Sequence, residues 1–145
     1  MVAALFWGIA LGVLLLDQLT KWIFYQSVWL PVELIPGILR FSEVHNTGAA
    51  FGLFGNGTVF LTIISILVCG YIAVTYKDYL SDKPTLVSIS LILGGAAGNL
   101  IDRVLRGFVI DFIEIVYWPT FNIADSAITI GGIILAYLLL TGKLK

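Results

Sequence analysis

The sequence predicts an all-α membrane protein with four transmembrane helices, surface loops and a small extracytoplasmic β-sheet. Three observations predict this class. The 145 residues are 59% hydrophobic and only 12% charged, with a mean hydropathy of +1.02, whereas soluble domains carry about a quarter charged residues. Four apolar stretches each approach the roughly 20 residues that a helix needs to cross a bilayer. The long connection between the first two stretches contains a strand-like segment flanked by turns.

The four predicted spans are residues 2–24, 58–76, 85–103 and 122–140. The first span has no basic segment before its apolar run, and no small-residue cleavage site follows it. We therefore interpret it as a retained membrane helix and not as a signal peptide. No internal repeat is visible, and residues 1–145 are expected to form one domain.

The connection between the first and second spans is expected to form the sheet. Residues 39–45 have the composition of a strand, and Pro36-Gly37 marks a turn before them. Asn46-Thr47-Gly48 is predicted to be a second turn. After it, residues 49–54 are expected to return as a partner strand, so that a small sheet lies on the membrane surface.

The distribution of positive charge bears on the orientation in the membrane, because four spans place both termini on one side. Lysines 77, 83, 143 and 145 lie on that side, and Lys21, Arg40, Arg103 and Arg106 lie on the other. These equal counts decide nothing by themselves. Lys21 and Arg103 belong to polar clusters at span ends, and discounting them favours cytoplasmic termini with the elaborate loops outside.

Composition also excludes several classes of protein. The net charge is −1 and the basic residues are scattered, so no nucleic-acid partner is expected. The single cysteine, Cys69, excludes an internal disulfide and a multi-cysteine metal site. The only histidine is His45, and the sequence contains neither a His-Glu-x-x-His nor a Gly-x-Ser-x-Gly motif. No metal and no cofactor are therefore expected.

Charged and amide side chains interrupt the apolar spans near their ends. Asp17 and Lys21 are four residues apart, so they share a helix face and can neutralise each other. A structural ion pair is favoured over direct catalysis for these two residues. Asn99, Asp102 and Arg103 also share one face, and Asp102 is expected to form a local ion pair with Arg103.

Glycines in the third span are expected to serve helix packing. Gly94 and Gly98 have the small-xxx-small spacing that lets another helix approach closely. Packing and an interfacial anchor explain these glycines, but they do not explain the amide of Asn99 in the same segment.

Two aspartates give the clearest indication of function. Asp111 lies in an apolar run just outside the third span, where desolvation raises the pKa of a carboxyl group. Asn122 and Asp125 share one face at the start of the fourth span; an N-cap with a first-turn acid explains them equally well. If Asp111 and Asp125 meet, they would share one proton and suit hydrolysis of an amide by an activated water, without metal or covalent intermediate.

Five segments together resemble the bacterial lipoprotein signal peptidases, the type II signal peptidases. They occur in the order of that family and cover most of the chain. The segments are Asp17-Gln18-Leu19-Thr20-Lys21, Asn46-Thr47-Gly48-Ala49-Ala50-Phe51-Gly52, Gly94-Gly95-Ala96-Ala97-Gly98-Asn99-Leu100-Ile101-Asp102-Arg103, Val109-Ile110-Asp111-Phe112 and Phe121-Asn122-Ile123-Ala124-Asp125.

The resemblance implies an intramembrane aspartyl endopeptidase of the bacterial inner membrane. Its substrates would be prolipoproteins with a diacylglyceryl-modified cysteine, cleaved just before that cysteine. The family's catalytic pair matches Asp111 and Asp125. The residues implied to bind substrate are Asn46, Gly48, Asn99, Arg103 and Asn122. Supporting parts are implied for Asp17, Lys21 and Asp102, with Asp102 expected to orient Arg103. The segment between Asp111 and Asn122 is a few residues shorter than in many members.

Two other classes remain as alternatives. Membrane aspartates also serve as proton or ion relays, so a small ion-conducting protein that uses the same aspartates is one of them. The other is a non-catalytic helper that packs partner helices through its glycines. Membrane lipid is expected as a partner besides the substrate, and the protein is expected to act as a monomer.

Overall fold

Four long apolar helices make up most of the molecule. The computed structural model describes residues 1–48 and 57–144. The helices are α1 (Val2–Phe24), α2 (Gly57–Thr75), α3 (Lys83–Arg106) and α4 (Ile123–Leu140), and a short 3-10 helix, η2 (Tyr76–Tyr79), follows α2. Each of the four is long and apolar enough to cross a membrane. The four predicted spans are thus confirmed as helices.

The largest difference from the predicted spans is at the end of α3. This helix continues past residue 103 to Arg106, where Gly107 adopts a left-handed conformation with φ of 80° and its N–H donates to the carbonyl of Arg103. Glycine adopts this conformation without steric cost, so it is the residue that ends a helix in this way. The extra turn brings Arg106 onto the same helix as Asp102.

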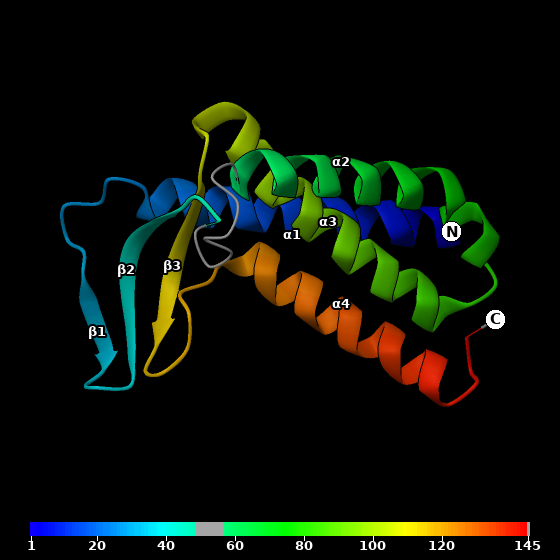
Figure 1. Cartoon of the computed structure of the whole chain (residues 1–145). Helices are drawn as coiled ribbons and strands as arrows, with labels where there is room; N and C mark the ends of the chain where they lie inside the picture. Colours follow the sequence, from blue (N-terminus) through cyan, green and yellow to red (C-terminus); the bar gives the residue numbers. More distant parts are fainter. Residues whose placement is uncertain (49–56, 145) are drawn as a thin grey trace.

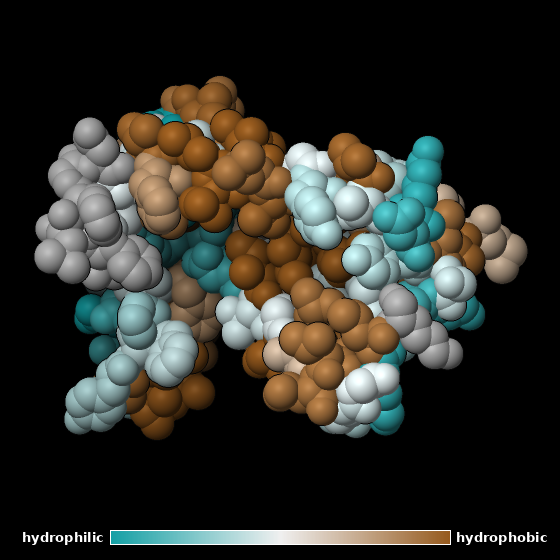
Figure 2. All heavy atoms as spheres, turned by 45° about the vertical axis from the view of Figure 1, so that its right-hand side comes forward, coloured by the Kyte–Doolittle hydropathy of each residue, from teal (hydrophilic) through white to brown (hydrophobic). Residues whose placement is uncertain are grey.

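Helix α3 lies at the centre of the bundle (Figure 1). It packs against α1, α2 and α4. In the most apolar 18-residue segment of α3, 61% of the residues are buried, compared with 11% in α2 and 22% in α4. The other helices expose much of their apolar surface, which is expected where lipid surrounds a membrane protein. Figure 2 shows such apolar surface over large parts of one face.

Glycines let α1 approach α3 closely, as the spacing of Gly94 and Gly98 predicts. A methyl group at Gly94 would lie 2.8 Å from Cβ of Val13, and one at Gly98 would lie 2.5 Å from Oδ2 of Asp17. These contacts are too short for any larger residue, so the two glycines set the distance between the helices. The space that Gly98 leaves is occupied by the carboxylate of Asp17.

The sheet has three antiparallel strands in the order β1-β2-β3. They are β1 (Val32–Ile35), β2 (Leu39–Asn46) and β3 (Val109–Ile115). The predicted strand at residues 39–45 is confirmed as β2, and Gly37 takes a positive φ in the turn before it. The partner strand predicted at residues 49–54 lies outside the described residues. Within the described ranges, the partners of β2 are β1 and β3.

The sheet lies at one end of the bundle and both termini lie at the other (Figure 1). Strand β3 begins shortly after α3 ends, and the ring of Phe112 in β3 stacks on Phe24 at the end of α1, with centroids 4.4 Å apart. The sheet is therefore fixed where α1 and α3 end and α4 begins. Asp111 of β3 faces Val44 of β2 in the register.

Candidate active site

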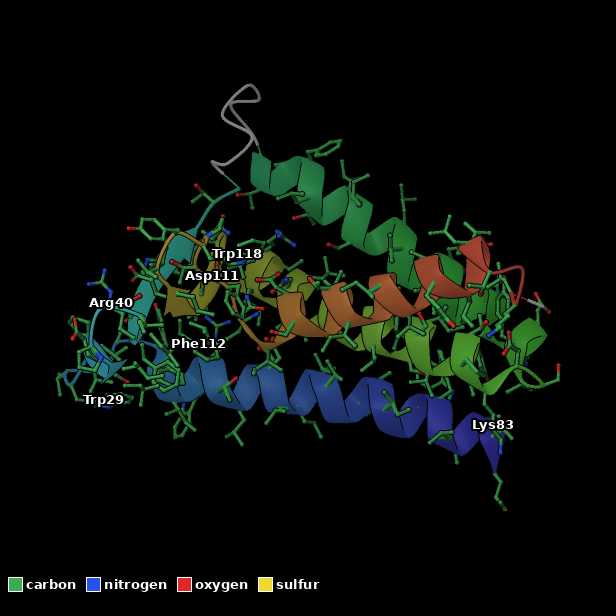
Figure 3. The ribbon with its side chains drawn as sticks, turned by 90° about the horizontal axis from the view of Figure 1, so that it is seen from below. Trp29, Arg40, Lys83, Asp111, Phe112 and Trp118 are labelled. Carbon is green, nitrogen blue, oxygen red and sulfur yellow. The ribbon has the colours of Figure 1, made fainter. Side chains whose placement is uncertain are left out.

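The predicted site residues gather where the sheet meets the helix ends. Figure 3 shows Asp111 at this junction. Three neighbouring helix ends and two strands contribute the side chains. Helix α1 contributes Asp17 and Lys21, α3 contributes Asn99, Asp102 and Arg103, β2 contributes Asn46, β3 contributes Asp111, and the start of α4 contributes Asn122 and Asp125. Gly48 follows Asn46 at the edge of the group.

Lys21 is the buried cation at the base of this group. Its ammonium lies 2.8 Å from Oδ2 of Asp17, 2.9 Å from Oδ2 of Asp102 and 2.8 Å from Oδ1 of Asn99. These three acceptors match the three donors of an ammonium group. Lys21, Asp17 and Asp102 are all fully buried, and a buried charge is tolerated when it is paired and hydrogen-bonded in this way. The expected pair of Asp17 and Lys21 is present.

Asp17 also fixes the start of α4. Its Oδ1 accepts a hydrogen bond of 2.9 Å from the backbone N–H of Ala124, in the first turn of that helix. The first N–H groups of a helix have no partner within the helix and carry partial positive charge, so a carboxylate is favourable there. Asp17 thus ties α1 to the segment that presents Asn122 and Asp125.

The amide of Asn99 has one possible orientation. Lys21 can only donate, so the side-chain oxygen of Asn99 must face it. The Nδ2 of Asn99 then points away from Lys21 and donates a hydrogen bond of 2.8 Å to Oδ1 of Asp125. The buried ammonium therefore determines which group of Asn99 faces Asp125.

Asn122 joins the two aspartates. Its Oδ1 accepts from the N–H of Asp125 at 2.9 Å, and Oδ2 of Asp125 accepts from the N–H of Asn122 at 3.3 Å, which forms a capping box. The N-cap interpretation of these residues is therefore confirmed. The Nδ2 of the same amide donates to Oδ1 of Asp111 at 2.7 Å, so one side chain both caps the helix and contacts the second carboxylate.

Asp111 receives an amide donor on each oxygen. Asn122 donates to Oδ1, and Nδ2 of Asn46 donates to Oδ2 at 2.9 Å. Asp111 is only 1% exposed. The pKa of Asp111 is raised to about 6, mainly by burial and also by the charge of Asp125, while the bonds from Asn46 and Asn122 oppose the increase. The chemistry open to this pair is that of an acid and a base near neutral pH.

Gly48 acts through Asn46. The N–H of Gly48 donates to Oδ1 of Asn46 at 2.8 Å, and Gly48 has a φ of 80°. This bond turns the Nδ2 of Asn46 toward Asp111. The N–H of Gly48 is thus already engaged, so the geometry favours a role in orienting Asn46 over direct contact with a ligand.

The expected pair of Asp102 and Arg103 is not formed; this prediction is wrong. Asp102 instead contacts Lys21, and its Oδ1 lies 2.6 Å from Nη1 of Arg106, one turn further along α3. Adjacent residues on a helix point in different directions, whereas residues four apart share a face. Arg103 donates to Ser65 of α2 at 3.4 Å and lies within electrostatic reach of Asp125 and Asp111.

Sequence reasoning missed two contributors to the polar network. Gln18 donates through Nε2 to the carbonyl of Gly98 at 3.1 Å and to Asp102 at 3.3 Å. Arg106 pairs with Asp102 and stacks over the ring of Tyr25 at 5.5 Å. The spacing of Asp102 and Arg106, four residues apart, is the signal that identifies the second of these.

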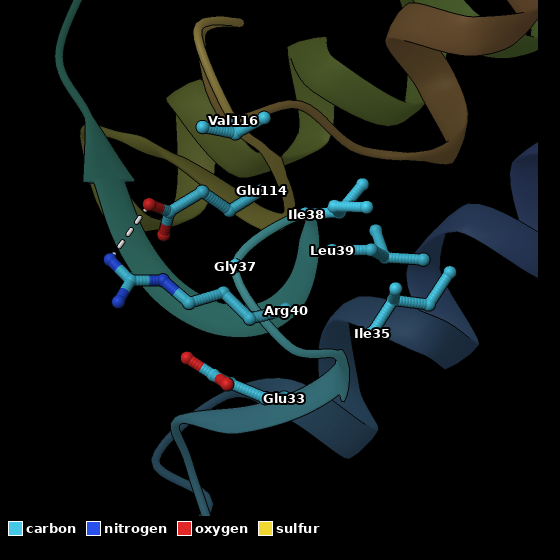
Figure 4. Close-up of a pocket in the computed structure, with 8 residues that line it drawn as sticks. All are labelled: Glu33, Ile35, Gly37, Ile38, Leu39, Arg40, Glu114 and Val116. Atoms are coloured by element: carbon cyan, nitrogen blue, oxygen red, sulfur yellow. Dashed lines mark hydrogen bonds and ion pairs between the residues drawn. The ribbon is translucent and has the colours of Figure 1, made fainter.

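A cavity of about 210 Å³ lies on the sheet, away from the carboxylate pair. Figure 4 shows Arg40 and Glu114 in it, joined by an ion pair of 2.7 Å. Hydrogen bonds from Arg40 and Ser42 hold the pKa of Glu114 below its usual range, so this half-buried carboxylate stays ionised and is unsuited to proton transfer near neutral pH. Within residues 1–48 and 57–144, no three metal-binding side chains gather at a spacing that suits an ion.

Comparisons with known proteins give one consistent result. The family described as signal peptidase (SPase) II matches residues 9–141. A lipoprotein signal peptidase of Moorella thermoacetica is 45% identical over 136 residues, which are 91% of this chain and 90% of the relative. The corresponding protein of Syntrophomonas wolfei is 45% identical, covering 95% of each chain.

Solved structures agree with these relatives. A bacterial membrane enzyme determined by the in meso method at 2.3 Å resolution has a TM-score of 0.82 and 38% identity, covering 92% of this chain and 85% of that one. A second such structure, at 1.9 Å, has the same TM-score and 39% identity. Sequence and fold together show that this multi-pass membrane protein belongs to the signal peptidase II family.

Proposed function

We propose that the protein removes signal peptides from diacylglyceryl-modified prolipoproteins, cleaving just before the lipidated cysteine, with Asp111 and Asp125 as the catalytic pair. Membership of the signal peptidase II family makes the chain a peptidase. The observation that supports the aspartyl mechanism is the shared contact of both carboxylates with Asn122, together with a pKa of about 6 for Asp111.

The two aspartates differ in a way that suits different roles. Asp111 is almost completely buried and holds its proton up to about pH 6. Asp125 is half-buried, accepts a bond from Asn99 and lies in the first turn of α4, where the helix dipole favours negative charge. We assign the shared proton to Asp111 and the negative charge to Asp125.

In each step of the proposed reaction, one aspartate takes up a proton and the other gives one. Asp125 takes a proton from water, the resulting hydroxide adds to the scissile carbonyl carbon, and Asp111 gives its proton to the carbonyl oxygen. Asp111 then takes a proton back from the tetrahedral intermediate while Asp125 donates to the departing nitrogen. The C–N bond breaks, leaving a carboxylic acid on the signal peptide and an amine on the lipidated cysteine.

The remaining polar residues suit the positioning of substrate. Arg103 donates a side-chain hydrogen bond to Ser65 and is half-buried within electrostatic reach of Asp125 and Asp111. In the proposed complex it and Asn46 hold peptide carbonyls, while Asn99 and Asn122 keep the carboxylates in place. Asp17, Lys21 and Asp102 support Asn99 and the start of α4 from below. All of these groups come from one chain, and we expect the protein to act as a monomer.

We further propose that the protein lies in the bacterial inner membrane with cytoplasmic termini and its carboxylates near the outer surface. The termini and the candidate site lie at opposite ends of the bundle (Figure 1). Lys77, Lys83 and Lys143 belong to the end that holds the termini, and once Lys21 and Arg103 are discounted as parts of the polar cluster, Arg40 and Arg106 remain at the other end. This small excess of positive charge favours cytoplasmic termini. A lipid-modified substrate reaches the site from within the bilayer in this orientation, and water reaches it from outside.

The proposal is tested with detergent-purified protein and a diacylated prolipopeptide. We expect Asp111→Asn and Asp125→Asn each to abolish turnover while substrate binding largely survives, since both variants remove proton transfer and retain shape. Asp78→Asn is the matched control, because Asp78 is exposed at the opposite end of the molecule. Full turnover in either site variant would contradict the assignment.

The proton-conduit alternative finds less support. The buried acids Asp17, Asp102 and Asp111 gather at one end of the bundle together with Asp125, and a fourth buried acid, Asp82, lies at the other end, where Thr85 donates to it. Among the described residues no acid lies in the helices between these two ends, whereas a relay needs titratable groups spaced across the membrane. Proton flux in liposomes that is lost in Asp125→Asn, with no peptide cleavage by the wild type, would favour the conduit.

A further inference from the structure

An apolar groove lies between α2 and α4 in the half of the molecule nearer the termini. Its volume is about 530 Å³. Its walls and floor are almost entirely apolar. Representative lining residues are Val68 and Ile72 of α2, Ile89 and Ile92 of α3, and Leu135 and Leu139 of α4. The catalytic proposal does not use this groove.

A stripe of residues along α4 leads from the groove to the candidate active site. Asp125, Ile128, Gly132, Leu135 and Leu139 follow each other at intervals of three and four residues, so they form one stripe along the helix. The first of them is a proposed catalytic residue, and the last two line the groove. All but Leu139 are half-buried.

A similar stripe runs along α3. Thr85, Ile89 and Ile92 line the groove, and the same spacing leads from them through Ala96 to Asn99 of the site. The stripe from groove to carboxylates therefore runs along the central helix as well.

Helix α2 forms the wall of the groove opposite α4. Ser65, Val68 and Ile72 follow the helical spacing, and Ser65 accepts the hydrogen bond from Arg103 that connects α2 with α3 beside the site. Figure 2 shows the resulting hollow, with a hydrophilic floor near the sheet and hydrophobic atoms further along.

We propose that this groove binds the apolar helix of the substrate's signal peptide; the inference rests on the function proposed above. The side chains of α2 and α4 form two ridges, and α3 forms the floor between them. A groove of this kind can receive an additional helix. Signal peptides carry an apolar segment of 7–15 residues, which as a helix is about 10–22 Å long. On α3, Thr85 at the far end of the groove is about 21 Å from Asn99 at the site, at 1.5 Å per residue.

The orientation of the bound helix follows from the topology. With its amino end toward the termini of the enzyme, the signal peptide runs antiparallel to α2 and α4, and its carboxyl end arrives at Asp125. Gly132 supports the close approach, because an added methyl group there would meet nothing within 4 Å. The groove thus holds the leaving segment of the substrate, while the acyl chains on the cysteine belong to the other side of the scissile bond.

The test obstructs the stripe between the groove and the site without replacing a catalytic group. Gly132→Trp places a large side chain on this stripe, one turn from Leu135 at the groove. Gly12→Trp is the matched control, since a methyl group at Gly12 on α1 would also meet nothing within 4 Å and Gly12 is exposed on another helix. Cleavage is measured for two diacylated substrates, one with the complete apolar segment and one truncated to the residues around the cysteine.

We expect Gly132→Trp to raise KM for the complete substrate at least tenfold and to leave kcat/KM for the truncated one within about twofold of wild type. Gly12→Trp should change neither. An equal loss on both substrates would overturn the inference, because it would indicate that the groove receives acyl chains or that the site is disturbed. No loss on either substrate would overturn it too. If the wild type cleaves neither, the proposed function itself fails.

Photo-crosslinking provides a second measurement that does not depend on the folding of Gly132→Trp. A benzophenone in the middle of the apolar segment is bound to the Asp111→Asn variant and irradiated. We expect adducts on α2 and α4. Adducts confined to α1, or distributed equally over all four helices, would contradict binding in the groove.

Discussion

Replacing Asp111 by Asn should abolish turnover and at the same time change how stability depends on pH. Asp111 is 1% exposed and its pKa is raised from 3.8 to about 6, mainly by burial. A carboxyl group whose pKa is higher in the folded state binds its proton more tightly there. The folded protein is therefore favoured at low pH and loses stability as the pH rises from about 4 through 6.

The size of this loss follows from the pKa difference. A shift from 3.8 to about 6 corresponds to about 3 kcal/mol between the fully protonated and fully ionised forms. About 1.4 kcal/mol of it falls between pH 5 and pH 7.5. For a chain of this length, that is roughly 3–6 °C in the temperature of unfolding. The asparagine does not ionise, so it does not undergo this loss.

The assay is thermal unfolding in detergent at pH 5 and pH 7.5, with the wild type and Asp111→Asn measured side by side. The difference between the two proteins isolates the titration of Asp111 from that of other groups. We expect the wild type to lose about 3–6 °C relative to the variant between the two pH values. Asp125→Asn should shift the change to lower pH, because the charge of Asp125 raises the pKa of Asp111. A parallel pH dependence in wild type and Asp111→Asn would refute the reasoning.

Three further predictions concern the pH profile, the buried cation and the helix contact. Since the proposed mechanism needs Asp111 protonated, kcat/KM should fall tenfold per pH unit above about pH 6; a flat profile from pH 5 to 8 would argue against it. Lys21→Met leaves the buried carboxylate of Asp17 without a cation and leaves Asp102 with Arg106 alone; it should cost about 3–5 kcal/mol, seen as a lower unfolding temperature, whereas exposed Lys77→Met should not. Gly98→Ala should destabilise the fold, because its methyl group would lie 2.5 Å from Asp17, and Gly12→Ala, with nothing within 4 Å, should not; equal unfolding temperatures for the two would contradict the packing argument.

The sequence predicts the helices well because each is a long and almost wholly apolar segment. Each span is a run of apolar residues of membrane length, and its ends are marked by polar clusters such as Asp17 and Lys21. The grouping of Asp111 with Asp125 also follows, because a short connection after the third span must return to the start of the fourth. That return places the two carboxylates at the same end of the bundle.

The sheet was harder to predict because strands are short and their partners are distant in sequence. The sequence predicts only a connection between the third and fourth spans, whereas residues 109–115 form β3 and Asp111 pairs in register with Val44 of β2. In residues 109–115, Asp111 lies on one face of the strand and Glu114 on the other, so neither face is wholly apolar and the alternating pattern of a strand is lost. The pairing of β2 with β3 joins residues that are more than sixty positions apart in the sequence. Local composition does not predict such distant contacts.

The polar network shows which contacts a spacing rule finds and which it does not. The pair of Asp17 and Lys21 follows from helical spacing, but the sequence prediction pairs Asp102 with Arg103, three residues before its actual partner Arg106. The bond from Asn99 to Asp125 joins two helices, and its direction is imposed by Lys21 on a third. Such orientations require the three-dimensional packing of α1, α3 and α4.

The central claim, that Asp111 and Asp125 act together on one water molecule, is tested most directly by a double-mutant cycle of cleavage. Rates for diacylated prolipopeptide are measured for wild type, Asp111→Asn, Asp125→Asn and the double variant. Residues that act as a unit are strongly non-additive, so we predict that each single change lowers kcat about as far as both together. A double variant whose loss is the product of the two single losses would contradict the claim.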